Sequence, residues 1–183
     1  DNNIKRVLLT GEGKAFCAGG DIKSMFLSSK VLNLKKNFLF KEYTLNYFIS
    51  QFSKPYLSIW NGIVMGGGVG LSVYGSARIA SEKSRFAMPE TGIGFFPDVG
   101  GSYFLSRISK GIGLYLGLTG QVINAKELVA FGLATHFQYS ENIEKTKSRF
   151  INNGFLPSSQ NIIDGPSTVL NNLNFIQDAF RGN

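Results

Sequence analysis

Short, mostly apolar segments bounded by glycine, proline or polar turns recur along the first two thirds of the chain. Runs of this kind, without a helical period, are typical of buried strands. The predicted strands are residues 4–10, 55–60, 78–80, 85–87 and 134–138. Pro55 opens the second of them, where a strand tolerates the missing amide donor. The single histidine, His136, lies in the last and is interpreted as structural.

Other segments repeat their apolar residues with the helical period. A short helix follows Asp21, which is expected to act as its N-cap. The longer predicted helices are residues 35–52, 102–108, 113–118, 125–131, 141–152 and 168–180. Gly132 is expected to end one of them as a C-cap. This alternation of strands and helices predicts an α/β fold.

Two glycine-rich segments interrupt the alternation. Residues 14–21 read KAFCAGGD, and residues 66–70 read GGGVG. Glycines expose backbone amides that can hold an anion or a developing oxyanion, because no Cβ atom shields them. The same glycines would also allow close packing of helices and strands. The pattern alone leaves both interpretations open, and neither segment matches a dinucleotide or P-loop fingerprint.

Residues 86–101, FAMPETGIGFFPDVGG, hold the main candidates for catalysis. Glu90 and Asp98 each follow a proline directly, which stiffens the backbone and disfavours a place in the middle of a helix. A carboxylate among apolar neighbours must be solvated, paired or raised in pKa, and a raised pKa makes it a base near neutral pH. The alternative is that both acids begin turns or cap helices, with Asp98 at the start of the next helix.

The composition narrows the class of protein. The chain has 183 residues, of which 43% are hydrophobic and 17% charged, as in one globular domain. The net charge of +7 suits a phosphate-bearing ligand or an anionic partner. The single cysteine, Cys17, excludes an internal disulfide. The longest uncharged run, residues 55–77, is broken by glycines and polar residues, so it is interpreted as buried core and no membrane contact is expected.

Three segments resemble the crotonase (enoyl-CoA hydratase/isomerase) superfamily: KAFCAGGDIK, VMGGGVGLS and FAMPETGIGFFPDVGGSYFLSR. The resemblance covers nearly the whole chain, and within the superfamily it is strongest to the 3-hydroxyisobutyryl-CoA hydrolase subgroup. It implies a spiral of ββα repeats. Residues 1–139 would form this core, without its first strands, and residues 140–183 would begin a helical C-terminal region. Family members extend further on both sides, so the chain is expected to be a fragment.

The resemblance also implies a site for acyl-CoA. The backbone amides of Gly20 and Gly67 would form an oxyanion hole for the thioester oxygen, and glycine at both places lets the amides reach it. The positions implied to lie along the CoA moiety are Ala18, Asp21, Ile22 and Lys23. The lysine would lie near the CoA phosphates.

Departures from the hydratase pattern point to the reaction. Hydratases of the superfamily carry one glutamate two residues after the triple glycine and another at the Pro-Glu position. Here Gly70 stands at the first place and Glu90 at the second, so addition of water to a double bond by paired acids is not expected. Asp98 and Glu42 match the hydrolase subgroup instead.

The resemblance therefore implies hydrolysis of 3-hydroxyisobutyryl-CoA, or a similar short branched 3-hydroxyacyl-CoA, as in valine catabolism. Glu90 would activate water or attack the carbonyl directly to give an anhydride. Asp98 would orient the substrate hydroxyl or the water, Glu42 would support this network, and Gly67 would bind the substrate with the three acids. No metal and no separate cofactor are expected.

Two alternatives stay open. One is another acyl-CoA reaction of the superfamily, as a hydratase or isomerase. The other is a structural role in the small subunit of a mitochondrial ribosome, with ribosomal RNA and proteins as partners, for which the positive charge is suitable. As a free enzyme the protein would bind acyl-CoA, either alone or as a homo-oligomer. The resemblance implies a mitochondrial location in a eukaryote and a cytoplasmic one in a bacterium.

Overall fold

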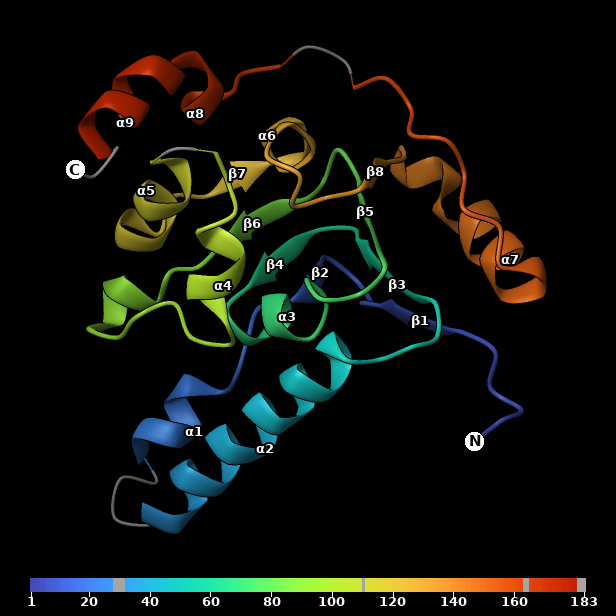
Figure 1. Ribbon diagram of the computed structural model, residues 1–183, viewed down its shortest axis with the longest axis horizontal. Coiled ribbons are helices and arrows are strands. Elements are labelled where there is room, and N and C mark those ends of the chain that lie inside the picture. The colour runs from blue at the N-terminus through green and yellow to red at the C-terminus, as the bar shows by residue number, and fades with distance from the viewer. Residues whose placement is uncertain (28–31, 110, 163–164, 181–183) are drawn as a thin grey trace.

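Two four-stranded sheets form the centre of the protein (Figure 1). The computed structural model describes residues 1–27, 32–109, 111–162 and 165–180. One sheet, in spatial order, contains β1 (Val7–Thr10), β3 (Tyr56–Trp60), β5 (Ala77–Ala80) and β8 (His136–Phe137). The other contains β2 (Ala15–Cys17), β4 (Ile63–Met65), β6 (Arg85–Ala87) and β7 (Ile123–Asn124).

The first six strands alternate between the two sheets, and a helical segment follows each of the three strand pairs that they form. All neighbours are parallel except β6 and β7. The turn between β3 and β4 lies close against the turn between β1 and β2. A Cβ atom at Gly62, where φ is 118°, would lie only 2.2 Å from the carbonyl oxygen of Lys14, so only glycine fits at this position. This arrangement is the predicted spiral of ββα repeats.

Helices join and flank these repeats. The first pair leads into α1 (Ile22–Leu27) and α2 (Leu32–Ser50), the second into α3 (Gly67–Gly70) and the third into the 3₁₀ helix η1 (Glu90–Ile93). The remaining helices are α4 (Gly101–Leu105), α5 (Ile112–Thr119), α6 (Ala125–Ala130), η2 (Ser140–Asn142), α7 (Ile143–Asn153), α8 (Thr168–Asn171) and α9 (Leu173–Phe180). In Figure 1, α1 and α2 project together at one end of the molecule, away from α8 and α9.

The core has two parts. The larger cluster joins Trp60 and Phe86 of the two sheets to α5, and it includes Val169 of α8 and Ile176 of α9. A smaller cluster packs one face of β3 and β5 against Phe150 of α7. Burying such a side chain stabilises the fold by about 1.5–3 kcal/mol. Helix α7 therefore packs on a sheet, and α8 and α9 add to the main core beside α5. The predicted division of the chain at residue 139 stays a prediction.

Most predicted elements are present, with two kinds of difference. The prediction of a single helix over residues 168–180 is wrong. The segment is divided between α8 and α9 because Asn172 leaves the helical conformation, with φ −114°, and its side-chain amide donates to the carbonyl oxygen of Thr168 at 2.8 Å. In addition, β2, β4 and β7 were not predicted as strands.

Candidate active site

The two glycine-rich segments lie against each other where β2 and β4 end. Gly19 has φ 102°, and a Cβ atom there would lie 3.3 Å from the amide nitrogen of Gly67. A Cβ atom at Gly67 would in turn lie 3.5 Å from the amide nitrogen of Gly20. Within the described residues, neither the Gly20 amide nor the Gly67 amide donates a hydrogen bond to the protein. Two neighbouring amides are therefore left for a ligand oxygen.

The three glycines of residues 66–68 lie in two different surroundings. A Cβ atom at Gly68 would lie 2.3 Å from the carbonyl oxygen of Cys17, so this glycine allows α3 to pack closely against β2. Gly66 and Gly67 instead face acidic side chains: a Cβ atom at Gly66 would lie 3.0 Å from Oε1 of Glu90. The first two glycines border the cavity, and the third belongs to the packing.

Glu90 is the first residue of η1 and is almost completely buried, with 8% of its surface exposed. Its Oε2 atom has no hydrogen-bond partner among the described residues. Burial raises the pKa of Glu90 to about 7, and the charges of Asp98 and Glu42 add to the rise, while a hydrogen bond from its own backbone acts in the opposite direction. A carboxyl group with this pKa is suited to general base catalysis near neutral pH.

Glu42 reaches the same place from α2. A Cβ atom at Gly67 would lie 2.5 Å from Oε1 of Glu42, so the carboxylate lies directly over this glycine. Glu42 is half-buried, and burial followed by the charge of Asp98 raises the pKa of its carboxyl group. Lys35, Phe38, Leu39 and Glu42 recur at helical spacing and line the cavity along one face of α2.

Asp98 is held by a side chain that the sequence analysis did not select. The hydroxyl of Tyr43 on α2 donates a hydrogen bond of 2.7 Å to Oδ2 of Asp98. Burial and this hydrogen bond raise the pKa of Tyr43 above its ordinary range, so the phenol stays a neutral donor. The alternative in which Asp98 caps the following helix is wrong, because Gly100 is the N-cap of α4 and no side chain caps it.

These groups open into one cavity of about 690 Å³. The predicted site residues in its lining are Ala18, Gly20, Ile22, Glu42, Gly67, Glu90 and Asp98. Apolar side chains such as Met25, Phe38 and Ile93 complete the wall. A mostly apolar cavity with a few converging polar groups is typical of a small-molecule site.

Two predicted residues lie outside this lining. The Asp21 side chain is exposed and accepts hydrogen bonds from the backbone and the hydroxyl of Ser24, which confirms it as the cap of α1. Lys23 is exposed, whereas Lys35 lines the cavity. The helical spacing of Lys35 and Glu42 could have suggested this lysine, but no local signal pairs Tyr43 with Asp98. The CoA-binding roles of Asp21 and Lys23 stay predictions.

Gly70 stands at the position where the hydratase pattern would place a second acid. A Cβ atom at Gly70 would lie 2.6 Å from Cβ of Val99 and 2.9 Å from Nδ2 of Asn46. Asn46 is 5% exposed, and both polar atoms of its amide lack a partner within the described part of the chain. The space that a side chain at position 70 would need is therefore filled from α2 and from the residue after Asp98.

In the parts of the chain described here, no group of three His, Cys, Asp or Glu side chains is arranged to hold a metal ion. The absence of a metal and of a separate cofactor stays a prediction. None of the helices within the described ranges has the length and hydropathy needed to span a membrane.

Comparison with known proteins agrees with this fold. The enoyl-CoA hydratase/isomerase family matches residues 1–174, and the chain belongs to this family. A crystal structure of an enoyl-CoA hydratase from Rhodobacter sphaeroides superimposes with a TM-score of 0.91 at 32% identity, covering 98% of this chain and 53% of that one. A carnitinyl-CoA dehydratase from Mycobacterium thermoresistibile gives a TM-score of 0.88 at 36% identity, covering 100% and 55%.

Curated relatives of this chain include proteins named 3-hydroxyisobutyryl-CoA hydrolase. A mitochondrial 3-hydroxyisobutyryl-CoA hydrolase from Danio rerio is 50% identical over 153 residues, which is 82% of this chain and 40% of the relative. The protein of the same name from Xenopus laevis is 43% identical over 193 residues, covering 97% of this chain and 50% of the relative. The chain thus spans half or less of the length of these relatives.

Proposed function

We propose that the protein hydrolyses the thioester bond of 3-hydroxyisobutyryl-CoA, or of a similar short branched 3-hydroxyacyl-CoA, to the free acid and CoA. One observation carries the proposal: the buried Glu90, with a pKa of about 7, lies beside two free glycine amides in a cavity shared with Asp98. The names of the relatives from Danio rerio and Xenopus laevis support the same substrate.

In this proposal the amides of Gly20 and Gly67 hold the thioester oxygen. Each such donor stabilises a developing oxyanion by about 2.7–4 kcal/mol. The apolar wall of the cavity would receive the acyl group and the adjoining part of CoA. Lys35 in the lining, together with the exposed Lys23 at the surface, would face the CoA phosphates.

Glu90 would act on the carbonyl carbon in one of two ways. As a general base, it takes a proton from water while the water oxygen bonds to the carbon and the carbonyl electrons move to the oxygen. The intermediate then collapses, the C–S bond breaks, and the thiolate recovers the proton from Glu90. As a nucleophile, Glu90 bonds to the carbon itself and expels the thiolate, and water cleaves the resulting anhydride. In both routes Asp98 orients the substrate hydroxyl or the water, and Glu42 supports the network.

Hydrolysis is preferred over hydration because of Gly70. Addition of water to a double bond by paired acids needs a second carboxylate, and Asn46 and Val99 occupy the space beside this glycine. The structural relatives described as a hydratase and a dehydratase support the fold and the acyl-CoA site, but they are less similar in sequence than the hydrolases.

The test is release of CoA from 3-hydroxyisobutyryl-CoA by the full-length protein, followed by thiol detection. We expect Glu90→Gln to lower kcat by about a hundredfold or more, as loss of a general base or nucleophile does. Asp98→Asn is expected to lower it as well. Glu141→Gln, at an exposed position in η2, serves as the matched control. Full activity in Glu90→Gln would contradict the proposed role.

We further propose a mitochondrial location if the source is a eukaryote, which the names of the relatives support. Assembly into a homo-oligomer or with a mitochondrial ribosome stays a prediction. Co-sedimentation with ribosomes that survives high salt would favour the structural role. Loss of the protein from the ribosomal fraction at moderate salt would indicate weak electrostatic association instead.

A further inference from the structure

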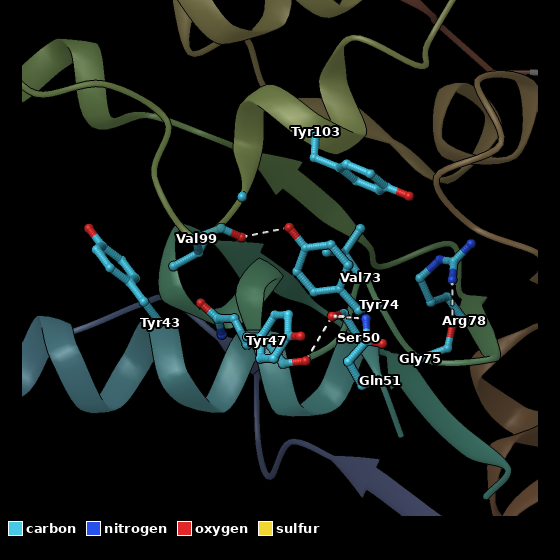
Figure 2. A pocket seen from close by; sticks show the side chains of 12 residues that line it. Tyr43, Tyr47, Ser50, Gln51, Val73, Tyr74, Gly75, Arg78, Val99 and Tyr103 are labelled. Atoms are coloured by element: carbon cyan, nitrogen blue, oxygen red, sulfur yellow. Dashed lines mark hydrogen bonds between the residues drawn. The ribbon is translucent and has the colours of Figure 1, made fainter. Parts of the chain in front are cut away.

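A second cavity, of about 660 Å³, lies beside the next face of α2 (Figure 2). Tyr43, Asn46, Tyr47 and Ser50 line it at helical spacing, one residue along from the face that carries Glu42. From the other side it is bounded by Val99 and Gly100, which directly follow Asp98. The hydrogen bond from Tyr43 to Asp98 therefore joins the wall of the second cavity to the candidate active site.

The backbone just after Asp98 is strained. Val99 has φ 44°, the only positive φ at a non-glycine residue in the described ranges. This conformation is unfavourable for a β-branched side chain, so it persists only where the surroundings enforce it. The Val99 side chain is 2% exposed and packed in the main core, which fixes one side of the residue.

A second tyrosine, Tyr74, fixes the backbone of Val99. The hydroxyl of Tyr74 donates a hydrogen bond of 2.8 Å to the carbonyl oxygen of Val99, as Figure 2 shows. Gly100 follows with φ 80°, and a Cβ atom there would lie 1.8 Å from the Tyr74 hydroxyl oxygen. Only glycine at this position lets the tyrosine reach the strained peptide.

We propose that Tyr43 and Tyr74 are positioning residues that together fix Asp98 for catalysis. Tyr43 holds Oδ2 of the carboxylate from α2, and Tyr74 holds the next peptide in its strained conformation. With Oδ2 occupied by the phenol, Oδ1 is the oxygen left to accept from substrate or water in the first cavity. Both donors reach Asp98 or its neighbour from the side of the second cavity. The kinetic consequence rests on the proposed hydrolase function.

The experiment compares Tyr43→Phe with Tyr47→Phe in the full-length protein. Tyr43→Phe removes only the hydroxyl that holds Asp98, and kcat for CoA release should fall by about tenfold to a hundredfold, as for a hydrogen bond to a charged group. KM should change less. Tyr47, one turn further along α2 and 70% exposed, serves as the matched control and should leave kcat unchanged. Tyr74→Phe should also lower kcat, as Tyr43→Phe does.

A double-mutant cycle separates positioning from a general loss of stability. If Tyr43 acts through Asp98, adding Tyr43→Phe to Asp98→Asn should lower kcat little further. Independent and multiplicative losses would overturn the proposal.

The position of the Asp98 carboxylate can be measured without an activity assay, and it tests the positioning role separately from the proposed hydrolase function. In crystal structures of the wild type and of Tyr43→Phe, the Asp98 carboxylate should leave its place beside the cavity in the variant only. An unmoved carboxylate would overturn the positioning role, even if no thioester is hydrolysed. A moved carboxylate in a protein without thioesterase activity would uphold the positioning role and count against the proposed function alone.

Discussion

A Cβ atom at Gly67 would lie 2.5 Å from Oε1 of Glu42, so the carboxylate from α2 occupies the space that any larger residue at this position would need. The relationship joins an oxyanion-hole candidate to a side chain 25 residues earlier in the sequence, and it makes the glycine a direct test of the site.

Gly67→Ala should displace the Glu42 side chain, because the methyl group meets the flexible end of a side chain rather than backbone. We expect the variant to fold, with a thermal midpoint within a few degrees of wild type, and to lose about tenfold or more in kcat. Thermal melts and CoA release measure the two effects. Gly165→Ala, at a glycine with no atoms within 4 Å of an added Cβ, is the control. Equal kcat in both variants would show that this position lies outside the reaction site.

Glu90 should make the protein less stable as pH rises. Its pKa increases from an ordinary value of 4.5 to about 7 on folding. Between these two pH values the unfolded chain has lost the proton while the folded protein keeps it, so the free energy of unfolding falls as pH rises and levels off above about pH 7. Such a rise in pKa corresponds to about 3 kcal/mol. Glu90→Gln should therefore be more stable than wild type at pH 8 by up to this amount.

Chemical denaturation of both proteins from pH 4 to pH 8 measures the difference. The advantage of Glu90→Gln should shrink below pH 7 and disappear near pH 4. A constant difference over this range would mean that Glu90 does not titrate with a raised pKa.

The pH dependence of activity should report the same group. If ionised Glu90 is the active form, kcat/KM should rise with pH with a midpoint near 7. The charge of Asp98 contributes to this raised pKa, after burial, so Asp98→Asn should move the midpoint to lower pH as well as lower the rate. Glu141→Gln should leave the midpoint in place. A midpoint that stays at its wild-type value in Asp98→Asn would argue against electrostatic coupling of the two acids.

Gly70→Glu should not create a hydratase. The new side chain would meet Val99 and Asn46, and overpacking of this kind costs about 1–3 kcal/mol. Urea denaturation should show the loss of stability, and an assay with an α,β-unsaturated acyl-CoA should show no hydration. Asn46→Ala in the same chain should recover part of the stability by making room. Hydration by the single variant would contradict the view that this space is closed.

The sequence by itself determined the features that depend on local backbone chemistry. The alternation of apolar runs and helical periods predicted an α/β fold, and the resemblance to the crotonase superfamily added the spiral of ββα repeats. Glycine-rich segments indicated exposed amides, among which the resemblance selected Gly20 and Gly67, and prolines before acids pointed to Glu90 and Asp98. Seven predicted site residues line one cavity. They lie at strand ends, in the loops between repeats or on a helix that faces these loops, and the spiral fold brings these parts of the chain together.

Only the tertiary structure decided which side chains meet across these segments. It pairs Tyr43 with Asp98, which lie 55 positions apart, and it places Lys35 rather than Lys23 in the cavity wall. It also sets the pKa of Glu90, because burial depends on every element packed around the carboxyl group. Contacts between distant residues leave no local pattern, since each depends on how α2 lies against the loop after β6.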